Sequence, residues 1–313
     1  MSNHSEPTGL PACNRRAFVK SGLAVMAASA LGANRLVAQA PIPASNKRIL
    51  KAIKFGMFQE KISVREKFQL LKEMGFDGVE LNSPGGVDKQ EAWQASLDTG
   101  LPIHGVVDSI HWQIRLSDPD PEVRAKGVEG LKTALRETKM VGGSSTLLVP
   151  CRVSDSKTEN HHQAWRRSIR EIRKALPLAA QLGVFILIEN VWNHFTYEHD
   201  GPNHQTAHQL AAYIDAINSP WVGSYFDIGN HQKYGLPEEW IRTLGKRIVK
   251  LDVKDWGIES SWAKIGDGDV NWPAVREALQ GIGFSGWATA EVGGGNRDRI
   301  REIGDRMDRN IVY

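Results

Sequence analysis

The sequence lacks the features of a disulfide-rich or membrane-spanning protein. Its 313 residues include two cysteines, of which only Cys151 lies beyond the first forty residues, so we expect no internal disulfide. The apolar segment from Gly22 to Ala33 is shorter than the roughly 20 residues that a membrane helix needs, so no membrane span is expected. No Gly-x-Gly-x-x-Gly follows the first strand-like run, which disfavours a dinucleotide-binding sheet.

An excess of charge is also missing. The formal net charge is +3, and the first forty residues account for all of it. In that segment four basic residues stand against one acidic residue (Arg15, Arg16, Lys20 and Arg35 against Glu6). The rest of the chain is formally neutral, which gives no reason to expect nucleic-acid binding.

The N-terminus has the three parts of an export signal in their usual order. A twin arginine at Arg15 and Arg16 precedes the apolar segment, and Ala38-Gln39-Ala40 is a small-residue cleavage site. We therefore expect residues 1–40 to be a twin-arginine signal peptide and the protein to be periplasmic or otherwise exported. A disordered basic tail is the alternative. Residues 41–313 are expected to form one domain, close to the roughly 250 residues of a typical eight-fold barrel.

Apolar strand-like runs alternate with amphipathic helical segments over the rest of the chain. Polar caps and glycines mark several helix ends, such as Ser63 before the first helix and Gly100 after the second. The expected strands are 52–58, 77–82, 102–107, 145–150, 184–190, 222–227, 248–253 and 286–291. The expected helices are 64–75, 88–99, 121–141, 160–182, 205–218, 237–245, 273–281 and 296–309. This alternation predicts an α/β fold, a closed (β/α)8 TIM barrel, rather than a doubly wound sheet.

Four carboxylates stand at the ends of the last four predicted strands: Glu189, Asp227, Asp252 and Glu291. The C-terminal ends of barrel strands meet around one pocket, so these acids are expected on one rim. Close like charges repel unless they are protonated or share a cation. Oxygen ligands suit Mn or Mg, with Co or Zn also open, and the sequence predicts one divalent metal ion held by these residues. Taken singly, each acid has an ordinary alternative as a strand-end salt bridge or helix cap.

Other polar and aromatic residues fall on the same rim. Trp suits the C–H face of a sugar ring, and His, Arg and Lys suit hydroxyl or carbonyl oxygens. We therefore expect a sugar-binding pocket, with ordinary loop polarity as the alternative for each residue taken alone. The expected substrate contacts are Glu80 at the end of strand two, His111 after strand three, Arg152 after strand four, Trp192 after strand five, His231 after strand six and Lys254 after strand seven.

Several stretches resemble a known family. They are Leu147-Leu-Val-Pro, Ile188-Glu-Asn-Val-Trp-Asn, Tyr225-Phe-Asp-Ile-Gly-Asn, Gly266-Asp-Gly-Asp-Val-Asn-Trp and Gly283-Phe-Ser-Gly-Trp-Ala-Thr-Ala-Glu. Over about residues 51–295 the chain resembles the xylose-isomerase-like barrels called sugar phosphate isomerases/epimerases. It resembles especially the ketose 3-epimerase and hexulose-phosphate isomerase branch, which implies a TIM barrel that acts on a sugar.

The resemblance also implies roles for individual residues. The family holds a divalent metal by Glu, Asp, His and Glu from strands five to eight, and Glu189, Asp227 and Glu291 match three of these positions. At the fourth position this chain differs from the family pattern, because Asp252 stands where the family has His. In the family the two glutamates, here Glu189 and Glu291, also form the acid/base pair that exchanges a proton beside a carbonyl.

The leading hypothesis is therefore a metal-dependent sugar isomerase or epimerase, with proton transfer through a metal-stabilised enediolate. One alternative is a 3-keto-sugar lyase or hydratase that uses β-elimination at the same site, and another is a non-catalytic sugar-binding barrel. An exported enzyme is expected to use a sugar without phosphate, because phosphosugars are kept inside cells. The neutral charge disfavours an apurinic endonuclease, which is built on the same superfold. The oligomeric state stays open, with a homo-oligomer as one option.

Overall fold

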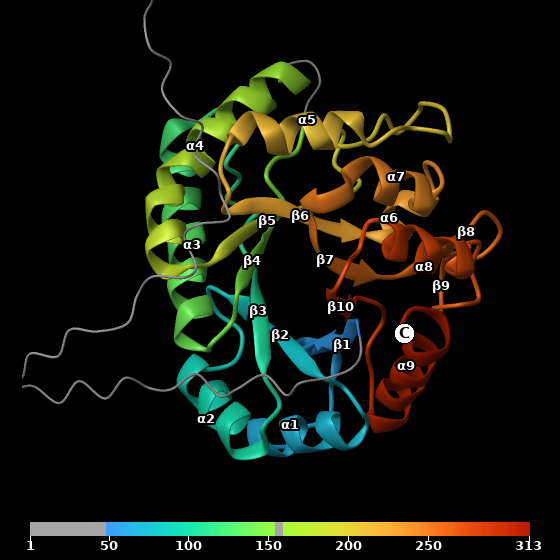
Figure 1. Cartoon of the computed structure of the whole chain (residues 1–313). Coiled ribbons are helices and arrows are strands. Elements are labelled where there is room, and N and C mark those ends of the chain that lie inside the picture. Colours follow the sequence, from blue (N-terminus) through green and yellow to red (C-terminus); the bar gives the residue numbers. More distant parts are fainter. Residues whose placement is uncertain (1–47, 154–158) are drawn as a thin grey trace, which may run out of the picture. The chain divides into compact units, whose positions relative to one another are not determined.

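The computed structural model describes residues 48–153 and 159–313, which form a closed barrel of parallel strands. Around the barrel the strands follow the order β1-β10-β7-β6-β5-β4-β3-β2, and the helices form an outer ring (Figure 1). The predicted TIM barrel is confirmed. The expected signal peptide, residues 1–40, lies outside the described residues.

The barrel strands are short and buried on both faces, as their apolar sequences predict. In β5, for example, Ile186, Leu187 and Ile188 are fully buried, which a parallel sheet covered by helices requires. The barrel strands are β1 (Ile49–Lys54), β2 (Gly78–Ser83), β3 (Ile103–Asp108), β4 (Ser145–Leu148), β5 (Phe185–Glu189), β6 (Val222–Asp227), β7 (Ile248–Val253) and β10 (Gly286–Ala290).

The first strand ends earlier than the sequence predicts. Residues 52–58 were expected to be extended, but β1 pairs with β10 only from Ile49 to Ile53. The ladder with β10 stops there, and Phe55–Met57 form a single 3-10 turn, η1, before Phe58 makes an isolated bridge with Gly295. Lys54 is consequently the last residue of its strand and reaches the same end of the barrel as the predicted carboxylates.

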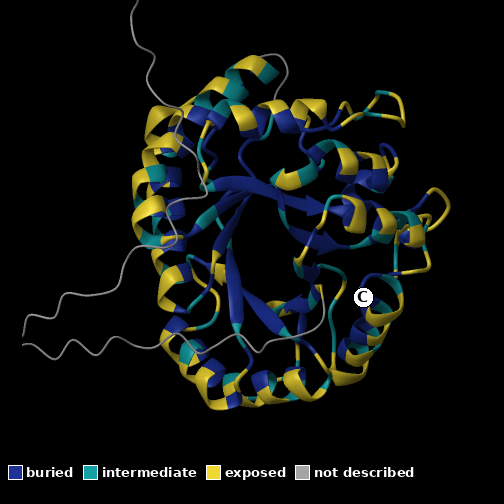
Figure 2. Cartoon of the chain, in the orientation of Figure 1, coloured by how far each residue is buried: buried dark blue, intermediate teal, exposed yellow. Residues whose placement is uncertain are grey.

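The helices begin and end where capping residues satisfy their free backbone groups. Ser63 accepts a hydrogen bond from the Glu66 N–H at 3.2 Å, and Gly100 closes its helix with a left-handed φ of 68°. The α-helices are α1 (Val64–Glu73), α2 (Lys89–Thr99), α3 (Pro121–Met140), α4 (His161–Leu182), α5 (His208–Ile217), α6 (Ile228–Gln232), α7 (Pro237–Leu244), α8 (Trp272–Gly281) and α9 (Arg297–Asn310), and η2 (Gly245–Arg247) is a second 3-10 turn. Their inner faces are buried against the strands and their outer faces are exposed (Figure 2).

None of the described helices combines the length and the apolar character that crossing a bilayer requires.

Two elements near the C-terminal ends of the strands were not expected from the sequence. One is the short helix α6, which follows β6 directly. The other is an antiparallel hairpin of β8 (Asp255–Gly257) and β9 (Ser261–Ala263) in the connection after β7. The Asp255 carboxylate fixes this connection, because it accepts hydrogen bonds from the Gly266 N–H at 2.7 Å and from Trp272 Nε1 at 3.0 Å.

Candidate metal and substrate site

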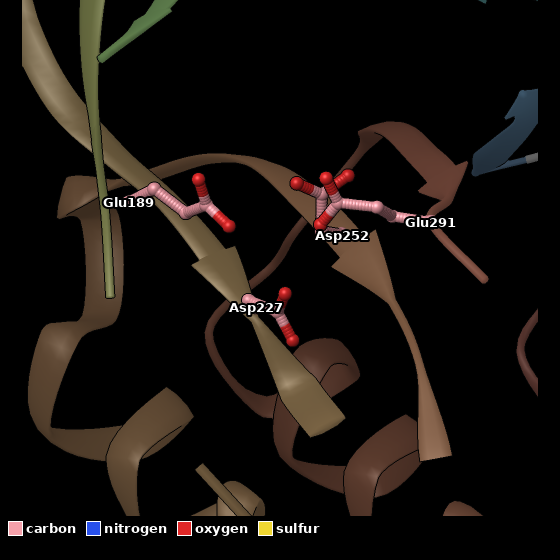
Figure 3. Close-up of side chains that lie close together, drawn as sticks. All are labelled: Glu189, Asp227, Asp252 and Glu291. Atoms are coloured by element: carbon pink, nitrogen blue, oxygen red, sulfur yellow. The ribbon is translucent and has the colours of Figure 1, made fainter. Parts of the chain in front are cut away.

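Four neighbouring strands bring the four predicted acids together (Figure 3). Glu189 ends β5, Asp227 ends β6, Asp252 is the second-last residue of β7, and Glu291 follows β10. One carboxylate oxygen from each lies within 4.8 Å of the others. The register explains the proximity, since Asp227 and Asp252 are direct partners on adjacent strands. The expected gathering of these acids on one rim is therefore observed.

An amide network fixes the position of Asp227. Asn190 accepts a hydrogen bond from the Asp227 N–H at 2.8 Å and donates one to the Asp227 carbonyl at 2.8 Å. Oδ1 of Asp227 in turn accepts from the Asn230 N–H at 2.8 Å and caps α6. With the backbone and Oδ1 committed in this way, Oδ2 of Asp227 is left to face the cluster.

Lys54 reaches the cluster from the end of β1. Its Nζ donates to Glu80 Oε2 at 3.0 Å and to Asp252 Oδ2 at 3.1 Å. It also lies 3.4 Å from Glu291 Oε1. The ammonium group therefore meets carboxylates from three different segments of the barrel, and its side chain is only 14% exposed.

Lys254 approaches the cluster from the connection after β7. Its Nζ lies 2.7 Å from Asp227 Oδ2 and 2.6 Å from Glu291 Oε2. Burial lowers the pKa of Lys254, but the surrounding carboxylates, first of all Asp227, raise it more, so the net shift is upward. Both lysines therefore stay cationic and neutralise part of the negative charge.

The two glutamates differ in proton affinity. Burial raises the pKa of Glu189, and the charge of Glu291 raises it further. Burial also acts on Glu291, but the ammonium groups of Lys54 and Lys254 outweigh it and lower the pKa of Glu291 to about 2. A pair of carboxylates whose environments separate their pKa values suits complementary acid and base roles.

The donor set fits a hard divalent cation. Asp252 is fully buried, and while its Oδ2 accepts from Lys54, its Oδ1 has no hydrogen-bond partner among the described residues. A buried carboxylate oxygen without a partner is costly, and a cation bound there would remove that cost. Because all four side chains offer oxygen, they suit Mn²⁺ or Mg²⁺ better than softer ions.

A cavity of about 400 Å³ opens beside the cluster. It is lined by Glu189 and Glu291, by the polar residues Asn82, Ser109, His111, Asn230 and Lys254, and by Val107, Trp112, Val191, Trp192 and Trp262. Two carboxylates, a few hydrogen-bonding groups and aromatic walls in one concave site are what a small polar substrate with C–H faces requires.

Two of the three tryptophans that line this cavity, Trp192 and Trp262, come from different connections and form a stacked pair. The rings of Trp192 and Trp262 stack at 4.7 Å between centroids and 19° between planes. Trp192 Nε1 donates to the Asn230 carbonyl at 2.8 Å, which fixes its ring. Trp262, on β9, remains half-exposed at 50%, as expected for a side chain at the mouth of a site.

Of the predicted substrate contacts, His111, Trp192 and Lys254 line the cavity. Glu80 does not. It is the third residue of β2 instead of its end, and its Oε2 is held by Lys54 beneath the cluster. Its predicted direct contact with substrate is therefore not supported by the cavity lining.

His231 and Arg152 are also absent from the lining. His231 is fully buried and stacks on Trp240 at 3.9 Å between centroids. Neither of its ring nitrogens has a hydrogen-bond partner among the described residues, and burial lowers its pKa to about 3. The carbonyl of Arg152 accepts from Arg115 Nη1 at 2.9 Å, so this backbone is tied to the connection after β3.

Several residues of the site were missed by the sequence analysis. Lys54 would have satisfied the same strand-end criterion as the acids had the end of β1 been set correctly. Asn230 follows Asp227 by three residues, the spacing of a side-chain cap, which is a usable signal. Trp262 lies on a three-residue strand that the hydrophobic pattern does not reveal.

Comparison with known proteins identifies the family and a curated relative. A family model described as Xylose isomerase-like TIM barrel matches residues 68–309. The L-ribulose-5-phosphate 3-epimerase UlaE of Escherichia coli (strain SMS-3-5 / SECEC) is 25% identical over 255 residues, covering 75% of this chain and 86% of the relative.

Solved structures share the fold at lower identity. D-allulose 3-epimerase from Methylomonas sp. matches with a TM-score of 0.68 and 17% identity, over 85% of this chain and 99% of that one. The 3-keto-D-glucoside 4-epimerase from E. coli matches with a TM-score of 0.65 and 18% identity, over 84% and 98%. At these identities the likeness establishes the barrel and leaves the substrate open.

Proposed function

Because this chain belongs to the xylose isomerase-like TIM barrel family, we propose that it is a sugar epimerase or isomerase that transfers a proton beside a carbonyl. The pairing of Glu189 and Glu291 carries this proposal. Both line the cavity, and their carboxylates point toward each other from opposite sides of the cluster (Figure 3). If one carboxylate removes a proton and the other returns it on the opposite face, the carbon is inverted.

The proposed reaction uses one divalent ion, Mn²⁺ or Mg²⁺, which would be held by Glu189, Asp227, Asp252 and Glu291. When bound, this ion would supply a Lewis acid that stabilises negative charge on the substrate oxygens. The all-oxygen donor set and the unpartnered Oδ1 of Asp252 support its inclusion.

His111 is suited to donate a hydrogen bond to the substrate. Its Nδ1 accepts from the Val149 N–H at 3.2 Å, so in the neutral ring the proton resides on Nε2. Burial, assisted by the charge of Lys54, lowers the pKa of His111 to about 3 and keeps the ring neutral. A neutral donor in the cavity can polarise a carbonyl or hold a hydroxyl without adding a charge.

We further propose that the substrate carries no phosphate. The lining contains one cationic side chain, Lys254, and its Nζ already contacts two carboxylates at 2.6 and 2.7 Å. Phosphate recognition needs cations or backbone N–H groups that are free to meet it. The stacked tryptophans instead offer an apolar surface for the C–H face of a sugar ring. The phosphate named in the substrate of the curated relative is therefore not transferred to this chain.

Solvent proton exchange tests the proposed function. Purified protein loaded with Mn²⁺ would be incubated in D2O with free ketoses, with their phosphates and with 3-keto-glucosides, and followed by NMR. We expect deuterium beside the carbonyl of an unphosphorylated sugar, together with an epimer or an isomer. Glu189→Gln and Glu291→Gln should each lower turnover by about 10²- to 10⁴-fold, the usual contribution of a general acid or base.

The products separate the competing functions. Loss of a leaving group without an epimer would establish the β-elimination instead. Saturable binding of a sugar with no exchange under any metal would mean a binding protein. Exchange only with phosphorylated ketoses would contradict the substrate part of the proposal and leave the reaction type intact.

A further inference from the structure

Lys54 is placed to act on one member of the cluster in particular. It does not line the cavity, so its ammonium group faces the carboxylates and not the substrate. Its hydrogen bonds run to Glu80 Oε2 and Asp252 Oδ2, both on fully buried side chains with 0% exposure. An ammonium group has three N–H donors, and the nearby Glu291 Oε1 at 3.4 Å accounts for the third direction.

The two oxygens of Asp252 are therefore in different situations. Oδ2 is fixed by Lys54, whereas Oδ1 is buried without a hydrogen-bond partner among the described residues. A carboxylate held at one oxygen keeps a constant orientation and offers the other oxygen in a fixed direction. Metal ligands are commonly oriented by such a partner outside the coordination sphere, and losing it typically costs 10- to 100-fold in metal affinity.

Charge gives a second reason for the pairing. When all four are ionised, Glu189, Asp227, Asp252 and Glu291 place four negative charges around one position. The Lys54 ammonium group, which also contacts Glu80, lies against Asp252 and offsets negative charge at this ligand. A divalent ion then meets the three other carboxylates, of which Asp227 and Glu291 contact the ammonium group of Lys254. This lowers the repulsion that four close carboxylates would otherwise impose.

We propose that Lys54 and Asp252 act as one unit in metal binding. Lys54 is the positioning residue: it orients Asp252 and offsets negative charge beside it, so that the aspartate serves as the fourth ligand through Oδ1. The proposal rests on the metal-dependent function proposed above and deepens it. It follows that an imidazole at position 252, which is itself neutral, is compatible with the site only when the Lys54 charge is removed.

A double-mutant cycle on Mn²⁺ affinity tests this coupling. The background variant is Lys54→Met combined with Glu80→Gln, which removes one positive and one negative charge, so that the net charge is unchanged while Asp252 loses its ammonium partner. Isothermal titration of metal-stripped protein would compare Asp252→His in the wild type and in that background. Glu80→Gln alone is the matched control and should bind Mn²⁺ within about threefold of the wild type, since the Lys54–Asp252 contact is retained.

Asp252→His should change the Mn²⁺ affinity differently in the two backgrounds. In the wild type it should weaken Mn²⁺ binding at least about tenfold, because the ammonium group of Lys54 has then lost its Asp252 partner and faces an imidazole and the ion. In the Lys54→Met/Glu80→Gln background it should retain or tighten binding and shift preference toward Co²⁺ or Zn²⁺. The same fold-change in both backgrounds would overturn the coupling.

Failure of this proposal can be told apart from failure of the proposed function. If the wild type binds no divalent ion, the metal-dependent function fails. If the wild type binds Mn²⁺ and the two backgrounds respond alike, only the role of Lys54 fails. Anomalous diffraction from Mn²⁺-loaded wild-type crystals gives a test that needs no variant to fold. It should show Oδ1 of Asp252 on the ion with Oδ2 on Lys54, and an Asp252 turned away from the ion would contradict the proposal.

Discussion

At the scale of single residues, the buried acids of this barrel differ in what compensates them. The acids of the cluster face lysine ammonium groups, whereas Asp108 at the end of β3 relies on a backbone contact. The Ile110 N–H lies 3.4 Å from its Oδ1, and this lowers its pKa only in part. Burial dominates and raises the pKa of Asp108 to about 7.

The stability of the protein should therefore depend on pH through Asp108. Folded Asp108 keeps its proton up to about pH 7, whereas the unfolded chain loses it near the ordinary value of 3.8. The folded state binds more protons in this window, so the stabilisation from this group is lost as pH rises through it. Asp108→Asn is neutral throughout, and its advantage over the wild type in unfolding free energy should grow by about 2.5 kcal/mol from about pH 5 to about pH 8. Urea unfolding at both values measures this, and a pH-independent difference would mean that Asp108 is ionised in both states.

Prediction of single residues from the sequence succeeded where the position of a residue along its strand determines which way its side chain points. Alternate residues of a strand face opposite sides, so acids at strand ends could be assigned to one rim. It expected His231 on the rim, whereas this residue lies on the short helix α6 and its ring stacks inward on Trp240. It missed Lys54 because the hydrophobic pattern continues past the point where β1 loses its ladder partner.

At the scale of elements, the site depends on the close approach of α6 to the connection after β7. Gly229 makes this approach possible: a Cβ at this position would lie 2.4 Å from the Lys254 Cβ and 2.8 Å from the Lys254 carbonyl carbon. Because Gly229 has no side chain, the connection after β7 can lie close to α6, and Lys254 can reach Asp227 and Glu291. Short loops that carry functional side chains on a rigid barrel are a general feature of this fold.

Gly229→Ala should accordingly displace Lys254 and lower turnover. We expect kcat/KM to fall about tenfold or more, with a loss of about 1–3 kcal/mol in stability from overpacking. Gly281→Ala is the matched control, because a Cβ at this last residue of α8 would have no atom within 4 Å. It should leave turnover unchanged and stability equal or slightly higher. Steady-state kinetics and thermal melting would be measured for both variants. Equal kcat/KM and equal stability of Gly229→Ala and Gly281→Ala would contradict the role given to the contact between α6 and Lys254.

Element-level prediction followed the strength of the local signals. Six-residue apolar strands and capped helices of ten or more residues could be placed within a few residues from sequence. The β8–β9 hairpin could not, because its strands have three residues each and are held by one buried carboxylate, Asp255, through contacts to Gly266 and Trp272 that only the folded chain creates. Trp262 lies on that hairpin, so its stacking on Trp192 could not be predicted from the sequence either.

At the scale of the whole molecule, the two ends of the barrel have different tasks. The carboxylates, the lysines and the cavity lie at the C-terminal ends of the strands. The described chain enters at the opposite end, where the Arg48 N–H donates to the carbonyl of the last residue, Tyr313, at 3.2 Å. The positive surplus of the chain lies within the first forty residues, so the barrel itself is formally neutral. A cut after residue 40 would remove that charge and keep every described residue of the site in the chain.

We therefore propose that residues 1–40 direct export and are removed, and the barrel permits this. The expected cut after Ala40 falls eight residues before β1, which begins at Ile49. Mass spectrometry of the periplasmic fraction should find a chain that begins at Pro41, while Arg15→Lys combined with Arg16→Lys should leave the full-length chain in the cytoplasm. A purified chain of residues 41–313 should match the full-length protein in thermal stability and Mn²⁺ affinity, because every described contact of the barrel is retained. An uncut N-terminus on protein recovered from the cytoplasm alone would remove the export proposal, and the argument for an unphosphorylated substrate would then rest on the cavity lining.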